Sequence, residues 1–303
     1  MTRGIVLGTL MVVGVVSVGV PALQQPPPSA EQINIEKVKD NLYVLRGGGG
    51  NTAVFVTGGG VVVVDTKNPG WGQPLLEKIK TLTDKPVTTI INTHTHYDHV
   101  SGNVEFPASV DIVVQENTKA LMAEMRDISG LGAQTNVFKD AKGRGQPKRT
   151  FKDRMSIGKG PEQIDLYYFG RAHTGGDAFV VFPAHRIMHV GDTFPNRGLP
   201  IMDASNGGSG VDYAATLSKA AGVPNVDAII NGHTPAQTTP ADLREYSEFV
   251  REFVTSVQEA KKSGRTVDDV VTTWKTPAKY TGYPAANPDR VRANAQVIWN
   301  ETR

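Results

Sequence analysis

The spacing His-x-His-x-Asp-His at residues 94–99 constrains this chain most, because it places three of its seven histidines within six residues. The apolar residues 87–91 precede it and are typical of a buried strand. Alternate residues project to the same side where a strand ends. One strand-to-helix turn can therefore converge several side chains on a small volume, as a divalent metal requires. The candidate ligands in this turn are His94, His96, Asp98 and His99.

A solvated histidine cluster that binds metal adventitiously is the alternative interpretation. It does not account for the buried strand that leads into the cluster. We therefore favour a built metal site.

Three further ligand-type residues follow strand-like segments later in the chain. The segments span residues 164–169, 187–190 and 226–230, and each is followed by a turn that contains glycine. Strand ends present functional loops, and glycine lets the backbone approach a site closely. With the first cluster, these turns supply five histidines and two aspartates, enough for two metal ions. The additional candidates are His173, Asp192 and His233.

The other candidate residues receive weaker assignments. His185 lies in a turn and His189 lies within a strand, so we expect structural roles for both. Asp65 and Asp177 remain open between two roles. Each could accept a hydrogen bond that orients a ligand imidazole, or it could cap a strand end.

Composition excludes several kinds of chemistry. The chain has no cysteine, which rules out disulfides, thiolate ligands and a cysteine nucleophile. Its formal net charge is +2, which gives no support for a nucleic-acid partner. We expect a small-molecule substrate.

The N-terminus is typical of an exported protein. Arg3 precedes an uncharged apolar run at residues 5–20, and small residues follow at the spacing of a cleavage site, which predicts a signal peptide over residues 1–22. An uncleaved membrane anchor is the alternative, disfavoured by glycines within the run and by Pro21. Cleavage would leave no stable membrane span. We expect a periplasmic or secreted protein with a linker at residues 23–35.

Hydrophobic periodicity predicts alternating strands and helices for the rest of the chain. The strands span residues 41–46, 53–56, 61–65, 87–92, 110–114, 164–169, 178–182, 187–190 and 226–230. The helices span residues 71–83, 116–125, 212–221, 241–262, 267–274 and 289–299. We expect one domain over residues 36–238 and a helical C-terminal extension over residues 239–303.

Residues 139–154 form a basic segment with seven Lys or Arg side chains. It could be a mobile lid that attracts an anionic substrate. A solvated, disordered insertion is the interpretation that we favour.

With these residues in place, the sequence resembles the metallo-β-lactamase-fold hydrolase superfamily, from the hairpin at residues 51–65 to His233. The resemblance implies an α+β fold, a four-layer αββα sandwich with the site between the sheets at one edge. It also implies two zinc ions, although iron or manganese would suit the same ligands. The first zinc would bind His94, His96 and His173, the second Asp98, His99 and His233, with Asp192 bridging.

Differences from particular members of the superfamily narrow the range of activities that the resemblance implies. Dedicated zinc β-lactamases have cysteine or serine where this chain has Asp192. With an aspartate at this position, the chain instead resembles glyoxalase II, lactonases and RNase Z. His96 disfavours the flavodiiron variant, which has glutamate there. Glyoxalase II also shares a helical C-terminal part, but is usually intracellular.

The resemblance implies a dinuclear zinc-dependent hydrolase. It would attack an ester, lactone, thioester or amide bond with a metal-bridging hydroxide, and Asp98 would be the catalytic group that accepts the proton and orients the water. Two alternatives remain. One is a zinc-binding accessory protein of an exported redox pathway, with the basic segment and the C-terminal helices as docking surfaces. The other is a zinc β-lactamase.

Overall fold

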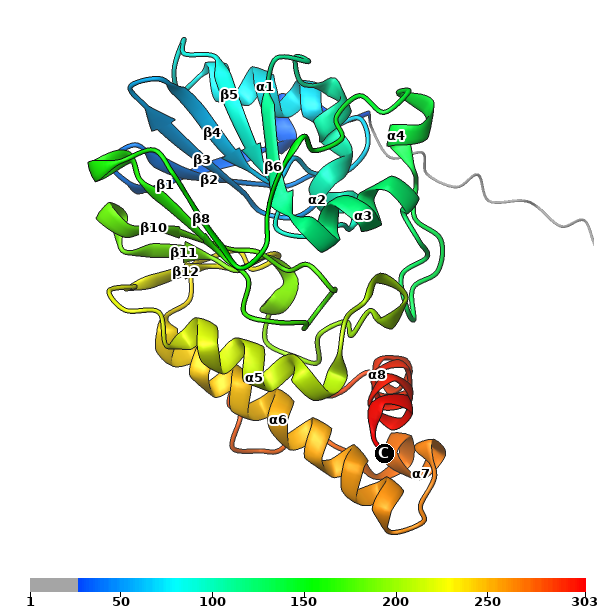
Figure 1. Cartoon of the computed structure of the whole chain (residues 1–303). Helices are drawn as coiled ribbons and strands as arrows, with labels where there is room; N and C mark the ends of the chain where they lie inside the picture. Colours follow the sequence, from blue (N-terminus) through cyan, green and yellow to red (C-terminus); the bar gives the residue numbers. More distant parts are fainter. Residues whose placement is uncertain (1–26) are drawn as a thin grey trace, which may run out of the picture.

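The computed structural model describes residues 27–303 as two β-sheets with helices on their outer faces (Figure 1). The signal peptide predicted at residues 1–22 lies outside the described residues. Of the predicted linker, residues 30–32 form a 3-10 turn, and the first strand begins at Asn34.

The first sheet contains seven strands in chain order. Its first four strands pair antiparallel, and the pairs from β4 to β7 are parallel. A parallel pair needs a crossover connection, which helix α1 (Gly72–Lys80) supplies between β4 and β5. The strands are β1 (Asn34–Lys39), β2 (Leu42–Arg46), β3 (Thr52–Thr57), β4 (Gly60–Val64), β5 (Val87–Ile91), β6 (Asp111–Gln115) and β7 (Arg149–Phe151).

The second sheet contains five strands in the order β12-β11-β10-β9-β8. Only its β11–β12 pair is parallel, and helix α5 (Gly210–Ala221) lies in that crossover. The strands are β8 (Arg154–Ile157), β9 (Ile164–Tyr167), β10 (Phe179–Phe182), β11 (Ile187–His189) and β12 (Ala228–Ile230). Three helices end the chain: α6 (Pro240–Lys262), α7 (Val267–Thr273) and α8 (Pro288–Glu301).

Alternating side chains of the strands divide the interior into layers. In β3, Ala53 and Phe55 belong to the core between the sheets, whereas Val54 packs in the core shared with α1. Phe55 meets Phe182 of the second sheet with ring centroids 5.4 Å apart. The outer face of the second sheet shares a third core with α5, α6 and α8. The predicted four-layer αββα sandwich is therefore confirmed.

The C-terminal helices complete the outer layer of the second sheet. The predicted boundary at residues 238 and 239 falls just before α6, whose Tyr246, Phe249 and Phe253 share one core with Phe179 of β10. We retain the division at residue 238 as a proposal. Across residues 27–303, no helix combines the length and apolarity needed to cross a membrane.

All seven basic side chains of residues 139–154 are exposed, as the solvated interpretation predicts, but the segment is not a disordered insertion. The segment continues from a short helix, α4 (Val137–Asp140), and then adds β7 to the edge of the first sheet. Phe151 anchors it, because only 4% of this residue is exposed. Strand β8 follows at once on the edge of the second sheet. The segment thus links the two sheets. Its edge strands span only three and four residues, too short for periodicity to reveal them.

Lys67 is a fully buried cation that follows β4, and sequence analysis did not identify it. Its Nζ donates to the carbonyl oxygens of Leu45 at 2.9 Å and of Gly50 at 3.0 Å. Burial lowers its pKa from 10.5 to about 7, although the charge of Asp65 opposes this. The unfolded chain therefore binds more protons than the folded chain between these pH values. The contribution of Lys67 to the free energy of unfolding should rise with pH across this window.

We predict that Lys67→Met flattens the pH dependence of stability. The lost slope should be at most about 1.4 kcal/mol per pH unit between about pH 7 and 10. Urea denaturation at several pH values would measure it, with the exposed Lys119→Met as the control. Equal slopes in the wild type and in Lys67→Met would contradict the prediction.

Candidate metal centre

The structure brings together all seven residues that were predicted as metal ligands. They come from the segments that follow β5, β9, β11 and β12, and Asp98 and His99 lie in the short helix α2 (Tyr97–Val100). Their candidate ligand atoms form three overlapping groups, each with all its atoms within 4.8 Å of one another. The groups are His94, His96 and His173; His94, His99 and Asp192; and Asp98, His99 and His233.

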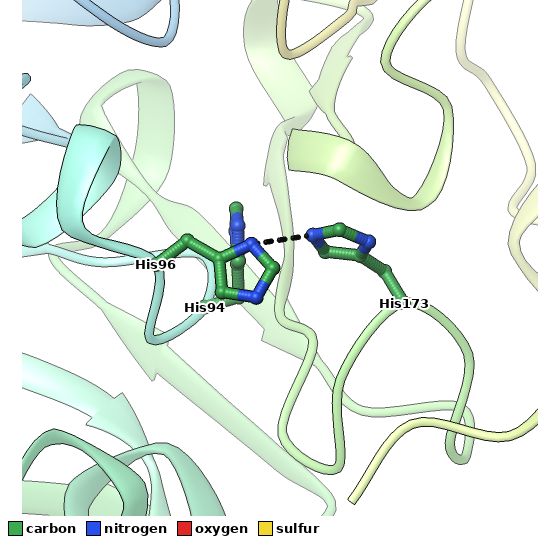
Figure 2. A group of neighbouring side chains, drawn as sticks. All are labelled: His94, His96 and His173. Carbon is green, nitrogen blue, oxygen red and sulfur yellow. Dashed lines mark hydrogen bonds between the residues drawn. The ribbon is translucent and has the colours of Figure 1, made fainter. Parts of the chain in front are cut away.

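The first group consists of imidazoles from two loops. Figure 2 shows His94 and His96, which follow β5, facing His173 across the site. His96 Nδ1 and His173 Nε2 are 2.9 Å apart. The ring centroid of His94 lies 4.8 Å from that of His96 and 4.7 Å from that of His173. This arrangement matches the set predicted for the first metal ion.

The group of Asp98, His99 and His233 lies next to the group of His94, His96 and His173, and Asp192 lies between these two groups. Asp98 Oδ2 is 3.3 Å from His233 Nε2 and 3.5 Å from His99 Nε2. The carboxylate of Asp192 lies 3.3 Å from His99 Nε2 and 3.1 Å from His233 Nε2. It also lies 3.9 Å from His173 Nε2 in the first group. Asp192 thus occupies the position that a bridging ligand needs.

A hydrogen-bonded chain behind His94 determines which of its nitrogens carries a proton. The Thr93 hydroxyl donates to Asp65 Oδ2 at 2.7 Å, so it can only accept from His94 Nδ1, 3.0 Å away. The Nε2 of neutral His94 therefore presents a lone pair. This atom is buried and has no hydrogen-bond partner among the described residues. A buried polar atom without a partner is unfavourable, and a metal ion would satisfy it.

Similar partners orient the other imidazoles. His96 Nε2 lies 2.8 Å from Asp203 Oδ2, and His173 Nδ1 lies 2.8 Å from the carbonyl oxygen of Ile201. These partners accept hydrogen bonds, so each ring turns its other nitrogen toward the site, and His96 Nδ1 and His173 Nε2 lie 2.9 Å apart. A lone pair on either nitrogen could bind a metal ion, and these nitrogen and carboxylate donors suit zinc.

Electrostatics divides the histidines into two kinds. Burial, followed by the charge of His96, lowers the pKa of His173 to about 4. Burial and three neighbouring imidazoles also hold the pKa of His94 well below its ordinary value. The charge of Asp192, opposed by burial, raises the pKa of His233 to about 10. For His99, burial opposes the rise, but Asp192, Asp98 and Asp65 raise the pKa well above its usual range.

Four other residues that the sequence singled out are not among the seven candidate ligands, namely His185, His189, Asp65 and Asp177. His189 Nε2 is 3.0 Å from the carbonyl oxygen of Asn51, and His185 Nε2 is 2.8 Å from Asn41 Oδ1. Asp65 is an outer partner, because its Oδ2 lies 2.7 Å from His99 Nδ1. Asp177 accepts from the backbone and hydroxyl of Thr174, and so it supports the loop that carries His173.

Sequence analysis missed Asp203, which supports His96. Asp203 lies in a loop without periodicity, and only the folded structure shows that it faces a ligand. Burial alone would raise its pKa, but the hydrogen bond and the charge of His96 lower it to about 2. Its other carboxylate oxygen accepts from the backbone N–H of Ser129 at 2.9 Å. Asp203 therefore joins the candidate ligand His96 to the loop at residues 128–132.

We predict that Asp203→Asn weakens metal binding. The variant keeps an oxygen acceptor for His96 but loses the charge, and the loss of such a partner costs about 10–100-fold in metal affinity or activity. Titration with a competing chelator would measure the affinity, with Asp227→Asn, an exposed partner of Arg186, as the control. Unchanged affinity in Asp203→Asn would show that this carboxylate does not tune the site.

A cavity of about 220 Å³ lies over the cluster. Apolar side chains form one wall, namely Ile128, Leu131, Leu199 and Ile201. Candidate ligands form the floor, and they are His96, Asp98, His173, Asp192 and His233. The cavity can therefore place a small molecule against the candidate metal ligands.

Comparison with known proteins agrees with this arrangement. A family model described as "Metallo-beta-lactamase superfamily" matches residues 45–249. The chain is 27% identical over 258 residues to "Metallo-beta-lactamase type 2" of Elizabethkingia meningoseptica, which covers 77% of this chain and 94% of that protein. It is 24% identical over 180 residues to "2,4-dinitroanisole O-demethylase subunit alpha" of Nocardioides sp., covering 58% of this chain and 51% of that protein.

Solved structures show the same fold at low sequence identity. A metallo-β-lactamase from Pontibacter korlensis superposes with a TM-score of 0.59 and 19% identity, covering 73% of this chain and 99% of that one. A variant of a sec-alkyl sulfatase superposes with a TM-score of 0.62 and 14% identity, covering 89% of this chain and 50% of that one. At these identities the likeness concerns the fold alone.

Proposed function

Because the chain belongs to the metallo-β-lactamase superfamily of metal-dependent hydrolases, we propose that it is a dinuclear zinc enzyme acting on a small molecule. The bond that it hydrolyses would be an ester, lactone, thioester or amide. One observation carries the proposal. Asp192 and His99 each stand close to candidate ligands of both metal positions, so the seven side chains form one continuous site rather than two separate ones.

The residues divide into two ligand sets and one shared group. His94, His96 and His173 would hold the first ion, and Asp98, His99 and His233 the second, with Asp192 shared. Zinc in this place supplies Lewis-acid polarisation of the scissile bond and a lowered pKa for water. Binding would replace the protons that the raised pKa values of His99 and His233 keep on these rings, so metal uptake should release protons.

Asp98 is the candidate catalytic carboxylate. It lines the cavity and also stands beside His233 and His99. Burial would raise its pKa, but these imidazoles hold the pKa of the Asp98 carboxyl below its ordinary value. An ionised carboxylate at the cavity wall can orient the attacking water and accept its proton.

Metal content and turnover, measured together, test the proposal. The mature protein would be loaded with zinc, desalted and analysed for metal per chain, with iron and manganese loading in parallel. A screen of esters, lactones, thioesters, amides and β-lactams would follow, with and without chelator. We expect two zinc ions and chelator-sensitive hydrolysis of one class. Two zinc ions without any turnover would favour the accessory-protein alternative, and one ion or none would contradict the ligand assignment.

A zinc β-lactamase is the second candidate, because the relative at 27% identity carries that name. Asp192 argues against it, since dedicated zinc β-lactamases have cysteine or serine there. We therefore expect at most weak β-lactam turnover. A susceptible host expressing the exported protein should gain little protection, and strong protection that chelation removes would support the β-lactamase instead.

We also propose that the protein is exported through a signal peptide at residues 1–22. The apolar run and the small residues that follow it support this. Mass spectrometry of the protein from a periplasmic fraction should find a chain that begins at Leu23. A full-length chain in the membrane fraction would support the anchor alternative.

A further inference from the structure

The cavity over the cluster continues toward the C-terminal helices. A second cavity, of about 450 Å³, adjoins it, and four residues line both: Leu131, Asn196, Leu199 and Arg290. The larger cavity lies between the loops at residues 130–131 and 196–199 and the C-terminal stretch at residues 284–290. A substrate that reaches the cluster can therefore extend along these shared residues toward α8.

Arg290 is an unneutralised cation at this junction. It lies in the first turn of α8, and its guanidinium makes no hydrogen bond or ion pair with any residue from 27 to 303 that the structure describes. Its Nη1 is buried without a partner. By contrast, Arg197 in the larger cavity contacts Asp242 at 2.9 Å, and Arg292 of the same helix contacts Asp268. Arg290 is also the only Lys or Arg among the described residues that line the smaller cavity.

No carboxylate among the described residues pairs with Arg290. Asp289 lines the larger cavity but forms no ion pair with it. Asp98 and Asp192 line the smaller cavity but pair with His99 and His233 instead. The nearby phenols of Tyr213 and Tyr246 are neutral, because burial raises the pKa of each well above its ordinary value. A half-buried guanidinium without a hydrogen-bond acceptor is unfavourable, and a bound anion would supply that acceptor.

Apolar side chains line the junction of the two cavities together with Arg290. Leu131 is 59% exposed, the most exposed large hydrophobic residue among those described, and it lines both cavities together with Leu199. These side chains suit a substrate whose middle segment is apolar. None of the basic residues at 139–154, which the sequence suggested might attract an anion, lines either cavity.

We propose that the substrate carries a carboxylate at the end remote from the scissile bond, and that Arg290 binds it. This inference rests on the proposed hydrolase function and names the class of its substrate. The planar guanidinium fork matches a carboxylate through two parallel hydrogen bonds, which lysine cannot reproduce. The substrate would thus be an anionic ester, lactone, thioester or amide with an apolar middle.

A panel of matched probes tests the role of Arg290. The probes are 4-nitrophenyl monoesters of straight-chain dicarboxylic acids of increasing length, each paired with the same compound bearing a methyl-capped second carboxyl. The zinc-loaded wild type should favour the free carboxylate at one chain length by about 10–100-fold in kcat/KM, mainly through KM. Arg290→Met should remove this preference, so that the free and the capped probe of each pair are hydrolysed with similar kcat/KM. Arg290→Lys should restore part of it.

Arg292→Met is the control, because it removes a charge from the same helix without lining either cavity. An equal preference for both members of every pair in the wild type would overturn the inference. An equal loss on both probes in Arg290→Met would assign the residue a structural role and overturn it too. If no probe is hydrolysed, calorimetry with the free dicarboxylates decides. Binding that Arg290→Met weakens at least tenfold supports the carboxylate site, and unweakened or absent binding overturns it.

Discussion

Asp192→Ala is expected to abolish hydrolysis and to leave fewer than two zinc ions on each chain. Asp192 is the carboxylate that stands close to both candidate ligand sets, 3.1 Å from His233 and 3.9 Å from His173. Loss of a residue that only orients a metal ligand already costs about 10–100-fold in metal affinity or activity. Loss of a shared ligand should therefore lower kcat/KM by more than about 100-fold. Metal analysis after desalting, together with kcat/KM on a substrate found in the screen, would measure both effects.

His189→Ala is the matched control for Asp192→Ala. His189 is buried near Asp192, but its ring contacts the backbone of Asn51 and of Gly191 rather than the cluster. The variant should lose about 1–3 kcal/mol of stability, because it leaves buried backbone groups without partners, and should keep its metal. Loss of zinc in His189→Ala would reveal an unrecognised ligand. Two tightly bound ions in Asp192→Ala would contradict the bridging assignment.

The sequence predicted which ligand-type residues lie close together, because each of their segments follows a strand that is apolar enough to recognise. The run at residues 87–91 is β5, and the segments before Asp192 and His233 end in β11 and β12. Strands β9, β11 and β12 run in the same direction in the second sheet, so their carboxyl ends lie at one edge and the residues after them converge. Spacing and strand order therefore carried most of the information about the candidate ligands.

Residues that act through tertiary contacts could not be predicted in the same way. Strands β1, β7 and β8 are edge strands. Charged residues occupy half of β1, and β7 and β8 span only three and four residues, so none of them gives a clear strand signal. Asp203 and Arg290 come from a loop and from the first turn of a helix, and their roles depend on what faces them in the fold. Asp65 was left between two roles until the contact with His99 became visible.

Removal of the metal should lower the stability of the whole fold. Without a metal ion, the buried His94 Nε2 has no hydrogen-bond partner among the described residues. The ligand loops also join both sheets. A metal that binds only the folded state at about 1,000 times its Kd adds roughly 4 kcal/mol, which corresponds to a Tm shift of about 10 °C. Calorimetry of the zinc-loaded and chelated protein would measure the shift.

Reloading and a variant separate this effect from damage by the chelator. Zinc should restore the Tm, whereas magnesium should not, because magnesium prefers oxygen ligands and most of these donors are imidazole nitrogens. Asp192→Ala should show a smaller difference between its loaded and chelated forms, since one shared ligand is missing. An identical Tm with and without metal would mean that the folded and unfolded chains bind the ion equally. In that case the side chains would not be preorganised as the structure places them.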